Sequence, residues 1–151
     1  MSGTAEIKMR LQISLLFVMF AGAAHAEHEF ANRDLAAGQT LYAEQCASCH
    51  GPNLEGEDNW QVRNDDGTMP APPHDETGHT WHHDSQLLFD YTRLGGAGAL
   101  AERGITDFAS AMPAFGDVLT ADEIWDVLAY IQSTWPEEVQ DIQAARSPGH
   151  Q

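Results

Sequence analysis

The chain has 151 residues, of which 42% are hydrophobic, and 23 acidic residues outnumber seven basic ones to give a net charge of −16. This length suits one domain and does not require two. So acidic a chain argues against nucleic acid or anionic lipid as a partner, because both select basic surfaces. It favours a partner with a basic patch, although acidity also serves solubility.

Residues 1–26 have the features of a bacterial-type secretory signal peptide. Lys8 and Arg10 precede an apolar run over residues 11–24, and small residues flank the end of that run. The run is shorter than the ~20 residues that a bilayer-spanning helix needs. We therefore expect cleavage after residue 26, export to a periplasm and no stable membrane insertion.

Cleavage would sharpen the charge imbalance. Loss of Lys8, Arg10 and Glu6 leaves five of the seven basic residues and 22 of the 23 acidic ones, a net charge of −17. All five remaining basic residues are arginines, so the mature chain would contain no lysine.

A helix is predicted over residues 35–45, directly ahead of the only two cysteines. Asn32 or Asp34 can cap its start. Its residues at helical spacing are Leu35, Gly38, Leu41, Tyr42 and Gln45.

The two cysteines, Cys46 and Cys49, are followed directly by His50, and this motif has three explanations in an exported protein. In the first, both thiols attach covalently to the vinyl groups of one haem and His50 binds its iron, a geometry that cysteines one helical turn apart can reach. A thioredoxin-like dithiol would need a preceding strand, and a helix is predicted there instead. Zinc would need four ligands, some of which histidines further along could supply. We favour covalent haem c, with one haem because no second such motif follows.

The stretch from Pro52 to Trp81 contains no predicted helix, and loops of this length tend to be functional or disordered. Arg63, Trp60 and Trp81 are candidates to contact the haem propionates through guanidinium and indole N–H groups. A tryptophan at the rim of a site can equally serve packing alone.

Metal-capable side chains are concentrated over residues 74–83, at His74, His79, His82 and His83. They could form a second site, for copper or zinc, or place a histidine on the haem iron. We prefer the alternative that they are partly exposed polar residues that bond the propionates and cap the next helix, because no thiol remains to complete a strong site.

A middle helix is predicted from Ser85 to Leu94, with Asp84 as its cap and Gly95 as its terminator. The glycine-rich residues 95–98 follow a helix and have no lysine nearby. We therefore interpret them as a flexible connection and not as a phosphate-binding loop.

Met112 is the predicted sixth ligand of the iron. Pro113 restricts it to an extended backbone, and a thioether ligand stabilises ferrous iron. Met69 also precedes a proline and competes for this role, and Met112 could instead fill the core. Position favours Met112, because it lies shortly before a well-formed last helix.

That last helix begins in a capping box formed by Thr120 and Glu123 and ends before Pro136. Its apolar face comprises Ile124, Val127, Leu128, Ile131 and Trp135. The polar tail over residues 137–151 is expected to fray.

A first helix ending in the cysteine motif, then Met112-Pro113, then a closing helix, together resemble a class I cytochrome c over most of the mature chain. The resemblance implies an all-α domain over residues 27–136, wrapped around one covalently bound haem, with long irregular loops. It implies His50 and Met112 as the axial ligands. It also implies that the first and last helices cross near a glycine and an aromatic residue, with Gly38 and Tyr42 meeting Leu128, Tyr130 or Ile131.

In that family a proline-bearing loop packs beside the histidine ligand, and a backbone carbonyl of the loop accepts a hydrogen bond from its second ring nitrogen. Pro70, Pro72 and Pro73 are the candidates here, and the sequence does not separate them.

The predicted function is that of a periplasmic carrier that moves single electrons between redox proteins and transforms no substrate. Alternatives are a subunit permanently bound to a periplasmic dehydrogenase or oxidase, a haem sensor with a labile sixth ligand, and a copper-handling protein that uses residues 74–83. Without lysine, the mature chain cannot form the lysine-ringed docking surface of mitochondrial-type carriers. The sequence leaves the donor, the acceptor and the oligomeric state open.

Overall fold

The computed structural model describes residues 29–147, so the predicted signal peptide lies outside the described residues. The regular elements are α1 (Leu35–Gln45), α2 (Ala47–His50), η1 (Thr80–His82), α3 (Ser85–Ala101), α4 (Ala121–Ser133) and α5 (Glu137–Ala144). No strand occurs between residues 29 and 147, which confirms the predicted all-α class. Over the same residues, no helix has both the length and the apolar character needed to cross a membrane.

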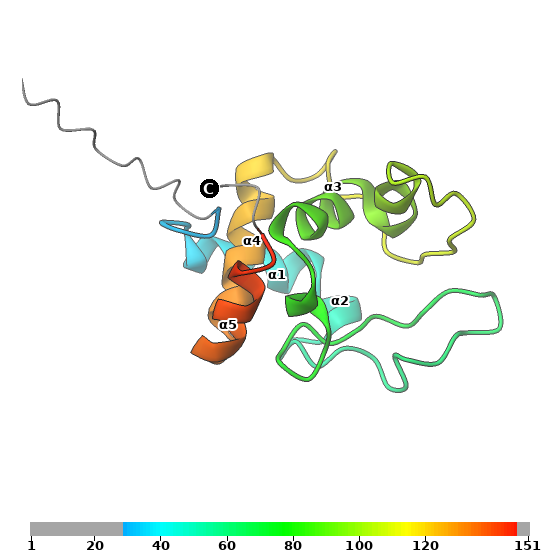
Figure 1. Ribbon diagram of the computed structural model, residues 1–151, viewed down its shortest axis with the longest axis horizontal. Helices are drawn as coiled ribbons and strands as arrows, with labels where there is room; N and C mark the ends of the chain where they lie inside the picture. Colours follow the sequence, from blue (N-terminus) through cyan, green and yellow to red (C-terminus); the bar gives the residue numbers. More distant parts are fainter. Residues whose placement is uncertain (1–28, 148–151) are drawn as a thin grey trace, which may run out of the picture.

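Helices α1 and α4 cross at the centre of the molecule (Figure 1). Gly38 of α1 lies so close to α4 that a Cβ atom on it would collide with the carbonyl oxygen of Asp126. The rings of Tyr42 and Tyr130 are 5.7 Å apart between centroids. The contact of Gly38 and Tyr42 with Tyr130 that the family resemblance implies is therefore confirmed.

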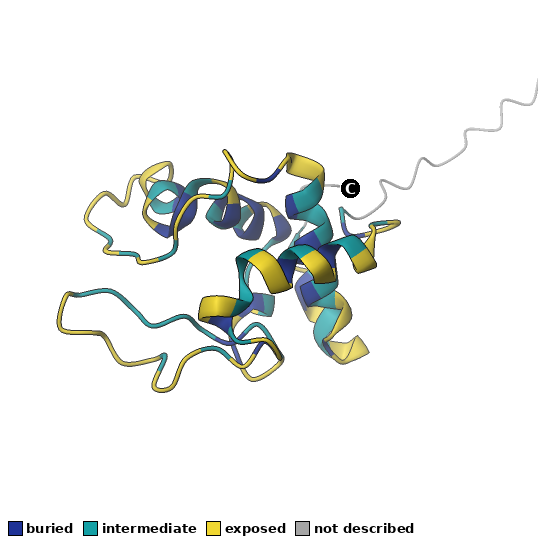
Figure 2. Cartoon of the chain, turned by 180° about the vertical axis from the view of Figure 1, so that it is seen from behind, coloured by how far each residue is buried: buried dark blue, intermediate teal, exposed yellow. Residues whose placement is uncertain are grey.

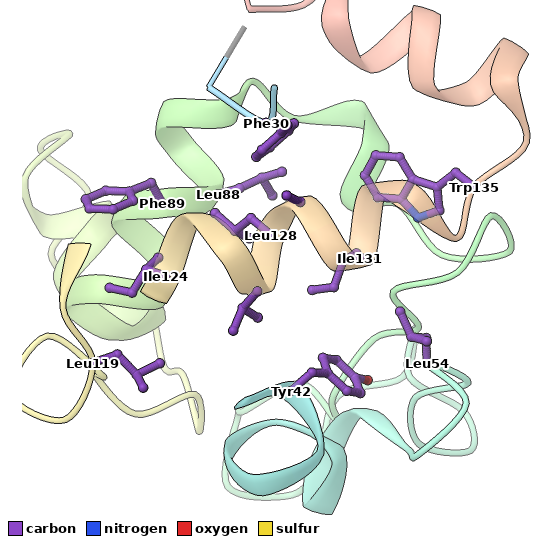
Figure 3. Packing of buried hydrophobic residues seen from close by; sticks show 12 residues of the cluster. Phe30, Tyr42, Leu54, Leu88, Phe89, Leu119, Ile124, Leu128, Ile131 and Trp135 are labelled. Carbon is purple, nitrogen blue, oxygen red and sulfur yellow. The ribbon is translucent and has the colours of Figure 1, made fainter. Parts of the chain in front are cut away.

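The apolar face of α4 packs against helices on two sides. Figure 3 shows Leu88 and Phe89 of α3 on one side of α4 and Tyr42 of α1 on the other. Ile124 and Ile131 are among the most buried residues of the chain, at 1% and 3% exposed. Each fully buried side chain of this kind contributes roughly 1.5–3 kcal/mol, so the buried face of α4 contributes substantially to the stability of the core.

Local hydrogen bonds explain where α1 and α4 begin. The Asp34 carboxylate accepts from the backbone N–H groups of Ala36 and Ala37, so Asp34 and not Asn32 is the cap. At α4, Thr120 and Glu123 make both reciprocal bonds of the predicted capping box.

Helix α3 differs from the prediction beyond Leu94. Gly95 interrupts it in the left-handed region, with φ of 73°, but the chain then resumes a helix as far as Ala101. The prediction of a flexible connection over residues 95–98 was therefore wrong. Gly95 can take this positive φ because it lacks a Cβ. It ends the first helical stretch after Leu94, as predicted, and a second stretch follows directly.

The tail is also more ordered than expected, because residues 137–144 form α5. Gln143 on this helix is fully buried, and its side-chain amide donates to the carbonyl of His83 and to Ser85 Oγ. Its amide oxygen accepts from Gln132. The expectation of a frayed tail was wrong for these residues, because one buried glutamine attaches α5 to the start of α3.

Two irregular segments, residues 51–79 and 102–119, extend to the same side of the molecule, away from the α1–α4 crossing (Figures 1 and 2). Their outer parts meet. The Arg63 guanidinium lies over the Phe108 ring at 6.0 Å, and a Cβ on Gly67 would lie 4.0 Å from that of Ala109. The two segments and α2 thus surround one end of the fold.

Candidate functional site

Cys46 and Cys49 lie on a single turn at the end of α1. Cys46 is the N-cap of α2, and its carbonyl accepts from the N–H groups of Cys49 and His50 at 3.1 and 3.0 Å. Both cysteines are free thiols, with Cys46 half-buried and Cys49 exposed. Burial, together with the nearby Cys49, raises the pKa of Cys46 to about 11. The two thiols therefore lie on neighbouring positions of one turn, close enough for both to bond to a single planar cofactor.

His50 is buried, and its ring is oriented by a backbone carbonyl. Its Nδ1 lies 2.8 Å from the carbonyl oxygen of Pro72. A carbonyl can only accept, so Nδ1 carries the proton and Nε2 keeps its lone pair for a metal. Burial lowers the pKa of His50, against the opposing effect of the Pro72 hydrogen bond. The ring is thus held as a neutral ligand. Of the three candidate prolines, Pro72 supplies this carbonyl.

Tyr42 fixes the backbone next to His50. Its hydroxyl lies 2.9 Å from the carbonyl oxygen of Gly51 and 3.3 Å from that of His50. Gly51 has φ of 81°, a conformation that reverses the chain directly after His50. The sequence indicated Tyr42 only as a core contact, because a hydroxyl reaching a carbonyl eight residues away has no local signature.

Two glycines allow the Pro72 segment to approach His50. The N–H of Gly56 donates to the His50 carbonyl at 2.8 Å. A Cβ on Gly56 or on Gly78 would collide with the backbone of Pro73. Both glycines therefore position the Pro72 carbonyl, and neither was identified from the sequence.

Met112 is half-buried on the segment 102–119 and is held by its backbone. Its carbonyl accepts from the N–H of Gly96 at 3.3 Å, and its N–H donates to Ser110 Oγ at 3.2 Å. A Cβ on Gly95 would lie 2.9 Å from the Met112 carbonyl oxygen. The glycines that the sequence suggested as a flexible connection instead form the surface against which the Met112 segment packs.

Met69 lies on the other irregular segment. It is half-buried, and it shares its segment with Pro72. Met112 lies on the segment that does not support His50. This placement favours Met112 over Met69 as the second donor to a haem iron, and the assignment stays a prediction.

The three residues suggested as propionate contacts have partners within the chain. Arg63 donates to the Gly67 carbonyl, Trp60 stacks on the His79 ring, and Trp81 Nε1 donates to the Glu76 carbonyl. These contacts help to fix the segment 51–79. The role of the three residues on the propionates stays a prediction.

The four histidines of residues 74–83 have different ring partners, although the rings of His79 and His83 contact each other. His74 stacks on His50, His79 stacks on Trp60, and His82 is exposed next to Trp81. His83 meets only the edge of His79 among these rings. Burial holds the pKa of His74 well below its usual range. Over residues 29–147, no group of three or more His, Cys, Asp or Glu side chains could hold a metal ion.

The donor set matches a covalently attached haem. Two thiols on one helical turn suit the two vinyl groups, and the adjacent imidazole has its Nε2 free for iron. The thioether of Met112 comes from a separate segment. A zinc centre would call for further His or Cys side chains at this turn, and a thioredoxin-like pair would call for a preceding strand, which α1 replaces.

Comparison with known proteins gives one match. The model of the family described as Cytochrome c matches residues 35–135, which is more than half of the chain. The match runs from the start of α1 to just beyond α4 and includes both cysteines, His50 and Met112. No curated protein and no solved structure matches the chain.

Proposed function

Because the chain belongs to the cytochrome c family, which binds covalent haem c and transfers electrons through it, we propose that it is an exported, periplasmic carrier of single electrons. It passes electrons between redox proteins and transforms no substrate. The observation that carries the proposal is the turn at Cys46 and Cys49, which ends in a histidine oriented by the Pro72 carbonyl.

Each residue of the site has a distinct role in this proposal. The bound haem supplies an iron that alternates between the ferric and ferrous states. Cys46 and Cys49 hold the haem by thioether bonds, and His50 binds the iron through Nε2. The hydrogen bond to Pro72 orients the imidazole and increases its basicity. Met112 supplies the sixth ligand, and its thioether favours the ferrous state.

A reversible one-electron redox titration of the haem-loaded protein tests the carrier function. We expect a single Nernstian transition for one electron, with the same spectrum recovered after each cycle. Irreversible oxidation, or a requirement for more than one electron, would contradict the proposal.

Two matched variants test the sixth ligand. Met112→Ala should abolish the weak red absorption of a thioether bound to ferric iron, and Met69→Ala should leave it intact. Both methionines precede a proline, so the pair controls for general effects of losing a half-buried side chain. Loss of the band in Met69→Ala would reverse the assignment.

We propose that the redox partner has a basic docking patch. Acidic side chains are exposed on both irregular segments: Glu55, Glu57, Asp58, Asp65, Asp66, Glu102 and Asp107. Opposite charges steer encounter and accelerate association at low salt.

The test of this charge complementarity uses small redox reagents. The rate of electron exchange with a cationic complex should fall as salt rises, and the rate with an anionic complex should rise, because salt screens both interactions. Equal salt dependence for the two reagents would contradict electrostatic steering.

Two further parts of the proposal, export and the absence of a permanently bound partner, can be tested on protein from the native source. N-terminal sequencing of protein from the periplasm should begin at Glu27, and retention of the first 26 residues would contradict cleavage. Size exclusion of a native extract should place the protein at the size of a free carrier. Elution with a dehydrogenase or oxidase would instead show a bound subunit.

A further inference from the structure

The ring of His74 lies directly on the ring of His50. Their centroids are 3.9 Å apart, and the planes differ by 22°, a stacked arrangement. His74 comes two residues after Pro72, so one short stretch of chain contacts His50 both at its Nδ1 and on its ring face.

Both the side chain and the backbone of His74 make hydrogen bonds that hold it in place. Its Nδ1 lies 2.8 Å from Thr80 Oγ1, and its carbonyl accepts from Trp135 Nε1 at 2.7 Å. Its backbone N–H donates to the Leu54 carbonyl at 2.8 Å. The side chain and the backbone are therefore both anchored, and the stacking face cannot shift without breaking these bonds.

The two contacts on His50 restrict different motions. The Pro72 carbonyl fixes the direction of Nδ1, but a single hydrogen bond leaves the ring able to swing about that bond. A rigid ring stacked on the face of the imidazole opposes this swing. The two contacts together define the ring plane, which the hydrogen bond alone does not.

We propose that His74 is a positioning residue that sets the angle of the His50 ring plane on the iron. The inference rests on the proposed role of His50 as an axial ligand. In ferric low-spin haem, the plane of an axial imidazole determines which porphyrin positions carry unpaired spin. While the second ligand stays the same, a change in the proton shifts of the four haem methyl groups therefore reports a change in this angle.

The test compares proton NMR spectra of the ferric, haem-loaded protein and three variants. His74→Leu removes the stacked ring, and we expect it to change the order or spread of the haem methyl shifts. His74→Phe keeps a ring that can stack but loses the bond to Thr80, and should retain the order seen in the unaltered protein. His79→Leu is the matched control, because His79 stacks on Trp60 and not on His50; it should leave the shifts unchanged.

An unchanged shift order in His74→Leu would overturn the proposal. So would an order in His74→Phe that is altered as much as in His74→Leu, because stacking would then not be the determining contact. A pyridine–haem spectrum of each sample separates this result from the proposed function. Absence of covalent haem contradicts the function, whereas unchanged shifts in a haem-loaded variant contradict only the role of His74.

A second measurement needs no substitution and decides the question if His74→Leu does not accumulate. In the ferrous, diamagnetic protein, rings stacked at 3.9 Å should give nuclear Overhauser cross-peaks between ring protons of His50 and His74. Their presence supports the stacked arrangement in the haem-loaded state. Their absence would show that the rings separate when haem is bound, and would overturn the proposal.

Discussion

The α1–α4 crossing and the segment 51–79 are held together by different interactions. At the crossing, the buried ring of Tyr42 packs against that of Tyr130, and Gly38 lets the helices meet. The segment 51–79 has few buried apolar residues and relies on backbone hydrogen bonds, such as that from Gly56 to His50. The crossing therefore determines whether the chain folds, and the segment determines how His50 is presented.

The largest effect should come from a change at the crossing. Gly38→Ala places a methyl group against the Asp126 carbonyl, and we expect a loss of about 3 kcal/mol in the free energy of unfolding. This outweighs the ~1 kcal/mol of helix propensity that alanine gains over glycine. Denaturant unfolding measures the loss, with Gln39→Ala on the exposed face of α1 as control. Equal midpoints for both variants would show that the helices do not meet as described.

A comparable change in the segment 51–79 should lower the free energy of unfolding less than Gly38→Ala does, and it should also shift the reduction potential of the iron. Gly78→Ala forces a methyl group against the Pro73 backbone and should cost about 2 kcal/mol. Because Pro73 follows the carbonyl that binds His50, the reduction potential should shift as well. Gly38→Ala, measured in the same way while still folded, should leave the potential nearly unchanged. A potential that moved equally in both variants would remove the distinction between the two regions.

Tyr42 joins the two regions, and its hydroxyl can be removed without changing the packing of its ring. Tyr42→Phe leaves the carbonyls of His50 and Gly51 without this donor, and we expect a loss of about 1.5 kcal/mol. The unfolding midpoint and the reduction potential should both change, each by less than in the glycine variant of its own region. A variant as stable as the unaltered protein would show that the hydroxyl does not link α1 to the site.

The smallest predicted effect is a loss of stability in alkaline solution. Burial is the main cause that raises the pKa of Tyr42 above its ordinary value of 10.0. Above pH 10 the unfolded chain releases this proton while the folded protein still keeps it. The contribution of Tyr42 to the free energy of unfolding is therefore complete well below pH 10 and declines as the pH rises above that value. Half a pH unit above that value the decline should be about 0.8 kcal/mol. The decline should be smaller by this amount in Tyr42→Phe but not absent, because burial also raises the pKa of Tyr91; an equal alkaline decline in both proteins would contradict this origin.

Features governed by neighbouring residues were predictable from the sequence. The capping box of Thr120 and Glu123, the cap at the start of α1 and the apolar face of α4 each depend on spacings of a few residues. The cysteine motif is of the same kind, because it specifies three contacts within five residues. These signals were sufficient for the helical class, for the first and last helices and for the haem attachment motif, whereas the crossing of the two helices was implied only by the family resemblance.

Features governed by distant contacts were not predictable. Nothing within α5 indicates that Gln143 would be buried against Ser85, and nothing near Gly95 indicates that its turn would support Met112. Three prolines were candidates to supply the carbonyl that binds His50, and only the path of the whole segment 51–79 shows that it is Pro72. The same path turns His74 onto the ring of His50, whereas His79 and His83 stay in contact with each other.

The most direct test of the central claim is a pyridine–haem spectrum of the reduced, periplasmically expressed protein, combined with peptide mass spectrometry. The account predicts one c-type haem for each chain, attached through thioether bonds at both Cys46 and Cys49. A protein that matures in the periplasm without covalent haem, or with a disulfide between the two cysteines, would contradict it.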